Sequence, residues 1–203
     1  MINVEQRILE YVSRETYEKF VKYKRLVEEW NRNTSLIQGQ TLHYFMERHI
    51  LDSLQLLPLI NRELPTLDIG TGAGFPGMVL AIAGLTNLTL CDSNQRKIIF
   101  LLELKRELDV DVQLICKRVE QLPINSYSQI VTRACADLSL LLEQALIVSR
   151  ETEKSPVLYA LKGQSIKQEI EKAQEKFKFN YEKINSVTNA DSVILKVIDI
   201  SRL

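Results

Sequence analysis

The sequence is poor in the residues that metal centres and disulfide scaffolds require. Its 203 residues include 3 cysteines and 2 histidines. Cys91, Cys116 and Cys135 show no C-x-x-C spacing, and each lies in or beside a strand-like stretch, so we expect buried, reduced thiols. His43 and His49 are spaced too far apart to place two neighbouring ligands on one helix face, so we predict no metal site.

Long apolar runs and an excess of either charge are also lacking. No stretch approaches the roughly 20 apolar residues that cross a bilayer, and the first residues, MINVEQRILEYVSRE, lack the basic end and apolar run of a secretory signal. We therefore expect a cytoplasmic protein without a membrane partner. The 26 basic and 26 acidic residues give a net charge of zero, so any contact with nucleic acid is expected to be local.

The spacing of apolar residues along the sequence changes near Pro65. Before it, apolar residues at helical spacing predict one helix over residues 4–30 and a second helical stretch that ends near Pro58. After it, short apolar or β-branched runs alternate with helical ones, which predicts a parallel sheet covered by helices on both faces. These helices are expected to begin near Gly77 and to span residues 94–108, 137–148 and 165–177.

Seven runs have strand character, and the last two have no helix between them. The runs are TLDI, NLTLCD, VQLIC, SQIVT, PVLYAL, FNYEKINSV and SVILKVIDI. Because only residues 188–191 separate the last two, we expect an antiparallel hairpin at the edge of the sheet. We interpret residues 1–62 as a helical cap that packs on a body formed by residues 63–203.

The segment LDIGTGAGFPG, residues 67–77, lies where the first expected strand meets its helix. Gly70, Gly72 and Gly74 permit positive φ and let the backbone approach a ligand, while free amides at the helix start point towards its anionic groups. Gly72, Gly74 and Gly77 also satisfy the G-x-G-x-x-G pattern of dinucleotide sites. The segment therefore predicts a site for a nucleoside cofactor.

Two carboxylates narrow the choice of cofactor. Asp68, just ahead of the glycines, suits the ammonium group of an aminoacyl cofactor better than a pyrophosphate. Asp92 ends the second expected strand, from which an acidic side chain can accept hydrogen bonds from a ribose diol. The alternative is structural, with Asp92 as the cap of the helix near Asn94 and Asp68 as an ordinary carboxylate at a strand end.

At this point the sequence resembles the RsmG (GidB) family of 16S ribosomal RNA guanine-N7 methyltransferases. The likeness extends over nearly the whole chain. Besides the glycine segment, it includes Glu-Trp-Asn at 29–31, Arg-His-Ile-Leu-Asp-Ser at 48–53, Cys-Asp-Ser at 91–93, Arg-Val-Glu at 118–120, Arg-Ala at 133–134 and Tyr-Ala-Leu-Lys-Gly at 159–163. The sequence departs from the family pattern in two segments. One is Thr34-Ser35-Leu36-Ile37, and the other is Cys135-Ala136-Asp137, where the family usually has an aromatic residue at the position of Cys135. Both departures concern substrate handling more than the cofactor loop.

The resemblance implies a Rossmann-like class I methyltransferase that uses S-adenosylmethionine. It implies that Gly70 and Phe75 lie along this cofactor, that Asp92 binds its ribose, and that Val119 and Glu120 flank its adenine. The substrate would be 16S ribosomal RNA or the small ribosomal subunit, modified at N7 of one guanine by a protein that we expect to be monomeric.

Two basic residues are candidates for the reaction itself. Arg133, at the end of the fourth strand, would complete the cofactor pocket, pairing with the cofactor carboxylate or an RNA phosphate; an ordinary salt bridge is the alternative. Lys162, after the fifth strand, would meet RNA unless it is a solvated lysine. His49 is expected to pack or hydrogen-bond between cap and body, and Trp30 to pack in the core.

The expected reaction requires no general base. N7 of guanine carries a lone pair and no proton, so attack on a sulfonium methyl group depends on orientation. The alternatives are a methyltransferase of this fold that acts on another RNA or a small molecule, a nicotinamide-dependent oxidoreductase, and a non-enzymatic RNA-binding factor. Asp68 and the terminal hairpin argue against the oxidoreductase.

Overall fold

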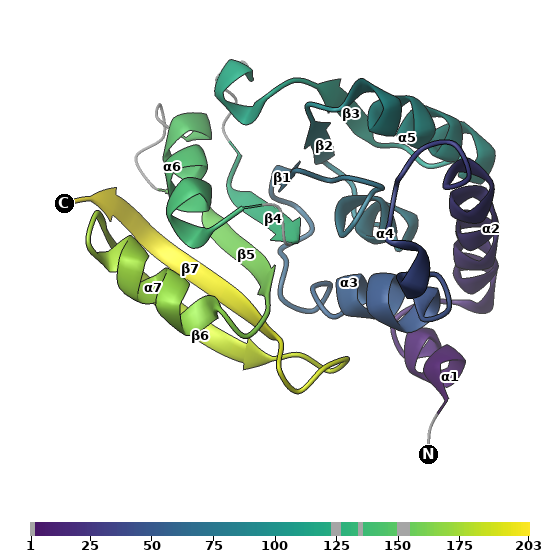
Figure 1. Cartoon of the computed structure of the whole chain (residues 1–203), viewed down its shortest axis with the longest axis horizontal. Helices are drawn as coiled ribbons and strands as arrows, with labels where there is room; N and C mark the ends of the chain where they lie inside the picture. Colours follow the sequence, from purple (N-terminus) through teal and green to yellow (C-terminus); the bar gives the residue numbers. More distant parts are fainter. Residues whose placement is uncertain (1–2, 123–126, 134–135, 150–154) are drawn as a thin grey trace.

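One mixed sheet forms the centre of the protein (Figure 1). The computed structural model describes residues 3–122, 127–133, 136–149 and 155–203. Within these residues seven strands pair in the order β3-β2-β1-β4-β5-β7-β6, and only the pairs that involve β7 are antiparallel. The strands are β1 (Thr66–Ile69), β2 (Leu88–Asp92), β3 (Gln113–Cys116), β4 (Gln129–Arg133), β5 (Val157–Lys162), β6 (Phe177–Asn185) and β7 (Val193–Arg202). The predicted parallel sheet with a terminal hairpin is confirmed.

The strand order reverses beside β1, which determines where a ligand can enter. From β1 the chain builds outwards through β2 and β3, and it then returns to build β4 and β5 on the other side. The connections on the two sides diverge at the carboxyl ends of β1 and β4. In open α/β sheets this divergence leaves a crevice at the carboxyl edge, and ligands bind there.

The helices cover both faces of the sheet and form the cap at its side. The cap contains α1 (Val4–Leu9), α2 (Arg14–Trp30), the short 3-10 helix η1 (Gly39–Thr41), the π-helix η2 (Met46–Leu51) and α3 (Asp52–Leu54). The body contains α4 (Gly77–Ile82), α5 (Gln95–Leu108), the 3-10 helix η3 (Val119–Gln121), α6 (Leu138–Val148) and α7 (Ile166–Gln174).

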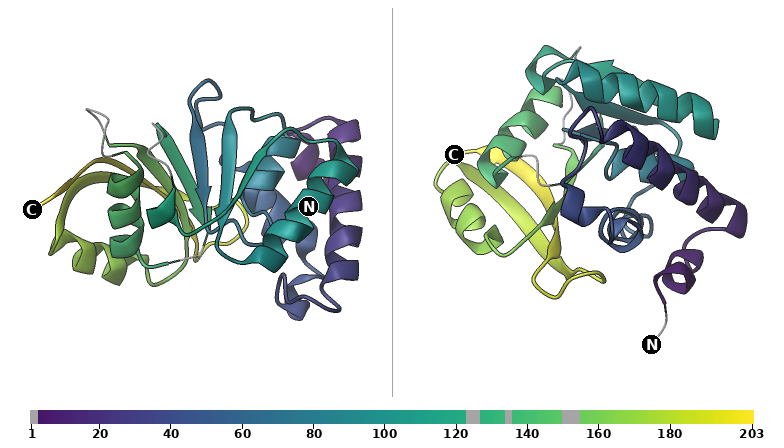
Figure 2. Two further views of the ribbon diagram at one scale, coloured as in Figure 1. Left: turned by 90° about the horizontal axis from the view of Figure 1, so that it is seen from above. Right: turned by 45° about the vertical axis from the view of Figure 1, so that its right-hand side comes forward.

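Each face of the sheet has its own apolar core. The cap helices share one core with α4 and α5, to which α2 contributes the fully buried Phe20, Tyr23 and Val27. The helices α6 and α7 form the second core with the terminal hairpin on the opposite side (Figure 2). Trp30 is partly buried against Phe100, with ring centroids 5.6 Å apart, as expected of a core residue.

The cap is less regular than its apolar spacing suggested. The helix expected over residues 4–30 is broken before Ser13, whose hydroxyl accepts the N–H of Thr16 and starts α2 anew. The second helical stretch ends as α-helix at Leu54, ahead of Pro58. There the side chain of Gln55 donates to the carbonyl of Asp52 at 2.9 Å and so replaces a backbone donor.

The turn between β6 and β7 is hydrogen-bonded to the cap, although the two segments lie far apart in the sequence. Thr188 Oγ1 donates to Asp52 Oδ1 at 2.7 Å, and the N–H of Val187 donates to Gln55 Oε1 at 3.0 Å. Arg7 also donates to the carbonyl of Val187. The terminal hairpin therefore closes against the cap as well as extending the sheet.

The helix caps resolve one of the alternatives for Asp92. The N-cap of α5 is Asn94, whose side-chain oxygen accepts the N–H groups of Arg96 and Lys97, so the interpretation of Asp92 as the cap is wrong. Asp137 does cap α6, because its Oδ1 accepts the N–H of Leu140 at 3.0 Å. At the end of β2, the carboxylate of Asp92 instead accepts the N–H groups of Gly72 and Asn94.

The cysteines correct one expectation and agree with another. Cys91 is buried in β2 and has a free thiol, as expected, but Cys116 is exposed. The expectation for Cys116 was wrong because β3 is an edge strand with little covering its end. Cys135 lies outside the described residues. No helix in the described part of the chain has both the length and the apolar character to cross a membrane.

Asn94→Ala should lower the free energy of unfolding by about 1 kcal/mol, because two amides at the start of α5 would lose their acceptor. Asn94→Asp, which keeps a side-chain oxygen, should stay close to the wild type. Urea unfolding followed by circular dichroism measures both values. An equal loss in the two variants would show that the cap oxygen does not stabilise α5.

Candidate functional site

The glycine loop between β1 and α4 has a backbone that other residues rarely adopt. Gly70, Gly72 and Gly74 have φ values of 65°, 61° and 101°. Gly77 begins α4 directly against β1, since a Cβ there would lie 2.5 Å from Asp68 Oδ2. The missing side chain lets the N–H of Gly77 donate to that oxygen at 2.8 Å. The loop and the helix start are thus held on the strand by a hydrogen bond.

Asp68 lies beneath this loop and is fully buried. No hydrogen bond of ordinary geometry reaches its Oδ1 among the described residues, although the side chain of Thr71 lies close enough to stabilise the carboxylate. Burial raises the pKa of Asp68 to about 7, although Thr71, the N–H of Gly77 and the charge of Arg133 act in the opposite direction. A cation placed beside Oδ1 would therefore favour the ionised carboxylate.

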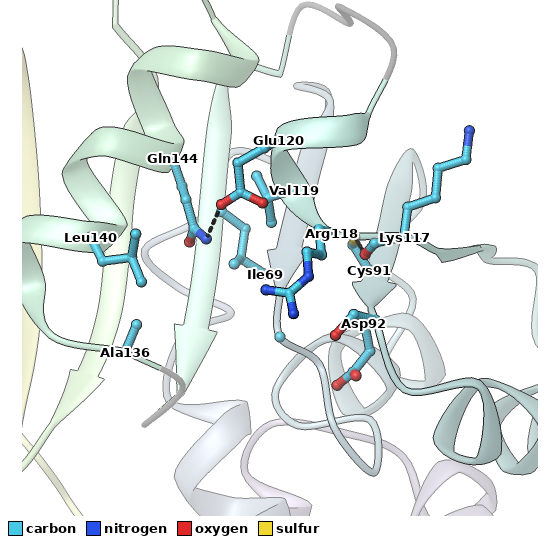
Figure 3. A pocket seen from close by; sticks show the side chains of 12 residues that line it. Ile69, Cys91, Asp92, Lys117, Arg118, Val119, Glu120, Ala136, Leu140 and Gln144 are labelled. Atoms are coloured by element: carbon cyan, nitrogen blue, oxygen red, sulfur yellow. Dashed lines mark hydrogen bonds between the residues drawn. The ribbon is translucent and has the colours of Figure 1, made fainter.

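A pocket of about 260 Å³ opens at the carboxyl ends of β1, β2 and β3 (Figure 3). It brings together four of the predicted cofactor residues: Gly70, Asp92, Val119 and Glu120. Its lining is completed by Ile69, Cys91, Ser93, Lys117, Arg118, Ala136, Leu140 and Gln144. The other predicted residues lie within the loop or behind it: Asp68, Gly72, Gly74, Phe75 and Arg133.

Asp92 connects the pocket to the glycine loop. Its Oδ2 accepts the N–H of Gly72 at 2.9 Å, and its Oδ1 accepts the N–H of Asn94 at 2.8 Å. Each carboxylate oxygen keeps a further lone pair, so both can still accept a hydrogen bond from a ligand. Figure 3 shows the carboxylate of Asp92 among the side chains that line the pocket.

Gln144 of α6 is a pocket residue that the sequence did not indicate. Its Nε2 donates to Glu120 Oε1 at 3.0 Å, and this hydrogen bond is the main reason why the pKa of Glu120 is lowered (Figure 3). Its Oε1 is buried and has no donor among the described residues. A polar atom left in this state requires a partner, so the pocket offers an acceptor to a ligand with an N–H group.

Arg133 lies on the far side of the loop from this pocket. Its guanidinium donates to the carbonyl of Arg48 at 2.9 Å and to His49 Nδ1 at 2.8 Å, and it lies 3.8 Å from Asp52 Oδ2. Its Cζ lies 4.7 Å from the centre of the Phe75 ring. Burial lowers the pKa of Arg133, and the charge of Asp52 opposes this. The salt bridge expected as the alternative role of Arg133 is thus present, with Asp52 as the partner, but Arg133 also contacts Arg48, His49 and Phe75.

His49 is buried between cap and body, as expected, and its tautomer follows from its neighbours. Because Arg133 can only donate, Nδ1 accepts and Nε2 carries the proton. Nε2 then donates to Thr41 Oγ1 at 3.1 Å, and that hydroxyl donates to the carbonyl of Gln38. Burial lowers the pKa of His49 to about 3, and the charges of Arg133 and Arg48 act in the same direction. The imidazole is therefore neutral near pH 7.

The cap holds the glycine loop through the ring of Phe75. Tyr23 stacks on that ring at 5.4 Å with an interplanar angle of 9°, and His49 stacks on it at 4.7 Å with an angle of 24°. Phe45 meets it edge-on at 5.7 Å. The hydroxyl of Tyr23 donates to the carbonyl of Ala73 inside the loop. Sequence reasoning did not identify Tyr23 or Phe45, because both read as ordinary residues of an apolar helix face.

Lys162 is occupied in a buried ion pair. Its Nζ lies 2.7 Å from Glu169 Oε2 and donates to the carbonyl of Ala136 at 2.6 Å. These contacts join the end of β5 to α7 and to the segment ahead of α6. They favour a positioning role, and contact between Lys162 and RNA stays a prediction.

A second, larger hollow, which we call the cap hollow, opens beside Arg133. Its volume is about 1080 Å³. The cap contributes Leu36, Ile37, Gln38, Thr41, Tyr44, Glu47, Arg48, His49 and Asp52 to its lining. The body contributes Lys97, Arg133 and Gly163, and the β6–β7 turn contributes Thr188, Asn189, Ala190 and Ser192. Among the residues that the structure describes, no group of three or more His, Cys, Asp or Glu is arranged to hold a metal.

Comparison with known proteins shows which family this chain is similar to. Residues 16–197 match the family described as rRNA small subunit methyltransferase G. The chain is 37% identical to ribosomal RNA small subunit methyltransferase G of Rickettsia akari over 193 residues, which cover 95% of this chain and 98% of the relative. It is 40% identical to the protein of that name from Orientia tsutsugamushi, with 92% of each chain covered.

Solved structures support the fold at low sequence identity. Magnesium protoporphyrin IX methyltransferase from Synechocystis, solved with bound S-adenosylmethionine, is 13% identical with a TM-score of 0.59. The match covers 87% of this chain and 96% of that one. A methyltransferase from Aquifex aeolicus is 14% identical with a TM-score of 0.54, covering 72% and 88%. At these identities the likeness concerns the fold alone.

The neutral state of His49 predicts a pH dependence of stability. Below its ordinary pKa of 6.5 the unfolded chain binds a proton that the folded chain refuses until about pH 3, so stability is lost as the pH falls through this range. Asp68 acts oppositely, because its raised pKa of about 7 lets the folded chain hold a proton that the unfolded chain releases. The two effects partly cancel in the wild type.

His49→Gln should separate these effects, because glutamine can still accept from Arg133 but does not titrate. Lowering the pH from 7 to 5 should stabilise this variant relative to the wild type by about 2 kcal/mol. Urea unfolding of both proteins at the two pH values measures the difference. If it stayed constant, His49 would titrate normally in the folded protein.

Proposed function

Because the chain belongs to the rRNA small subunit methyltransferase G family, we propose that it transfers a methyl group from S-adenosylmethionine to N7 of one guanine in 16S ribosomal RNA. Family membership favours this function over the oxidoreductase alternative. The observation that carries the proposal is the pocket at the carboxyl ends of β1 to β3, with Asp92 among its lining residues. We also propose that the protein acts as a cytoplasmic monomer.

The pocket has the groups that an adenosine requires. Asp92 would accept the two hydroxyl groups of the ribose, since both of its oxygens retain lone pairs. The side chains of Val119 and Leu140 supply apolar walls for the flat faces of an adenine. The unpartnered Oε1 of Gln144 would receive the amino group of the base, with Glu120 holding the amide in place. These residues fit the nucleoside part of S-adenosylmethionine.

The glycine loop would hold the aminoacyl part. Gly70 lines the pocket, and the positive φ values of the loop keep its backbone open to a ligand. Beneath it, the Oδ1 of Asp68 carries the predicted attraction for an ammonium group. Arg133, on the other side of Phe75, is the candidate partner of the carboxylate. We retain both assignments as parts of the proposal.

The chemistry requires alignment more than proton transfer. When bound, S-adenosylmethionine supplies an electrophilic methyl group next to a positively charged sulfur. The protein's part is to hold the donor and the guanine in one orientation, which can contribute on the order of 7–11 kcal/mol to the lowering of a barrier. The braced loop suits this task because Phe75 is held by Tyr23, His49 and Arg133. The neutral His49 adds no second cation beside Arg133.

A methyl-transfer assay tests the proposed function directly. Radiolabelled S-adenosylmethionine and the wild-type protein are incubated with small ribosomal subunits, and separately with naked 16S RNA, from a strain that lacks this protein. We expect label at N7 of one guanine, located by chemical cleavage at the modified base. Label on neither RNA, in spite of calorimetric binding of the donor, would overturn the proposed substrate.

Asp92→Ala should weaken the binding of S-adenosylhomocysteine roughly tenfold or more, because hydrogen bonds between a carboxylate and the ribose diol are lost. Asp92→Asn, which keeps one acceptor, should fall between this variant and the wild type. Asp111→Ala is the matched control, since its side chain is fully exposed and lies outside the pocket. Wild-type affinity of Asp92→Ala by calorimetry would refute the ribose assignment.

A further inference from the structure

The cap hollow borders the loop that would present the methyl donor. At one side, the Nζ of Lys97 lies 3.9 Å from the position that a Cβ would take on Gly72. At the other, Arg133 lines the hollow while its guanidinium covers the ring of Phe75. The hollow therefore lies at the same carboxyl edge of the sheet as the adenosine pocket, beyond the glycine loop.

An unpartnered aromatic ring lines this hollow. Tyr44 is 63% exposed, and among the exposed large apolar side chains that the structure describes only Leu203 is more exposed. It directly precedes Phe45, which is fully buried against Phe75 and His49. The backbone beneath Tyr44 is therefore held firmly, while its ring remains available to a ligand. Aromatic rings in such positions bind nucleobases by stacking, whatever the base.

The charges of the cap hollow favour a polyanion over a cation. Its two acids already have basic partners, Glu47 with Arg7 at 3.6 Å and Asp52 with Arg133 at 3.8 Å. The exposed side chain of Arg48 has no acidic partner within the described residues. The hollow thus combines a free guanidinium with a free aromatic ring, although the chain as a whole has no net charge.

We propose that the cap hollow receives the acceptor nucleotide, with Tyr44 stacking on a base of the RNA and Arg48 binding a backbone phosphate. The inference rests on the proposed function for the identity of that RNA. The volume of about 1080 Å³ holds a whole nucleotide. A guanine must leave its helix to present N7 here, since the major groove of duplex RNA is too deep and narrow.

The test compares three variants in two measurements. Tyr44→Ala removes the ring, Tyr44→Phe keeps it without the hydroxyl, and Arg48→Ala removes the charge. The first measurement is the affinity of the protein for a short single-stranded RNA that contains guanine, by fluorescence anisotropy over a range of salt concentrations. The second is KM for small subunits in the methyl-transfer assay, beside the calorimetric affinity for S-adenosylhomocysteine.

We expect Tyr44→Ala to weaken RNA binding and raise KM on the order of tenfold, because base stacking is lost. Tyr44→Phe should recover most of this loss. Arg48→Ala should reduce the slope of the logarithm of affinity against the logarithm of salt concentration by about 1. None of the three should change the affinity for S-adenosylhomocysteine.

Tyr181→Ala is the matched control, since Tyr181 is 43% exposed on the edge strand β6 and does not line the hollow. It should bind RNA as the wild type does. Equal RNA affinities of Tyr44→Ala and the wild type, or equal losses in Tyr44→Ala and Tyr181→Ala, would overturn the proposal. Absence of methyl transfer by the wild type would contradict the proposed function alone, because the RNA-binding comparison still decides the role of the hollow.

Discussion

The stacking of aromatic rings on Phe75 determines how the rest of the site is built. Phe75 belongs to the glycine loop, and its ring is covered by Tyr23 and His49 of the cap and by Arg133 of β4. The loop has three positive φ values; it is held by backbone hydrogen bonds from Gly74 and Phe75 to the carbonyl of Thr71, and by the packing of the Phe75 ring against the cap. The cap therefore supplies one wall of the loop.

The same packing explains the unusual protonation states on either side of the loop. Burial favours the neutral form of both His49 and Asp68, so it lowers one pKa and raises the other. Near neutral pH the imidazole carries no charge, and burial favours the protonated form of the Asp68 carboxyl. The guanidinium of Arg133 is the charged group between them, and it is surrounded by acceptors. The loop thus lies between the adenosine-sized pocket and the cap hollow, with Arg133 as a charged group beside it.

Sequence reasoning gave the order of strands and helices because each is governed by local periodicity. It also located Asp92, since an acid at the end of a parallel strand must lie at the carboxyl edge. It missed Tyr23 and Gln144, whose contacts depend on how separate elements pack. For Lys162 it left a contact with RNA and a solvated side chain as alternatives; the structure contradicts the solvated one, because Lys162 is buried in an ion pair with Glu169 of the following helix. No local pattern distinguishes a free lysine from a paired one.

The strand order also has a consequence for synthesis on the ribosome. The inner position beside β5 is filled by β7, which follows β6 in the sequence, and the turn ahead of β7 is hydrogen-bonded to Asp52 and Gln55 of the cap. A nascent chain therefore carries the cap early but leaves the edge of β5 unpaired until residues 193–202 have emerged. Because one wall of the cap hollow is this turn, the hollow is completed only after residues 188–192 have been synthesised.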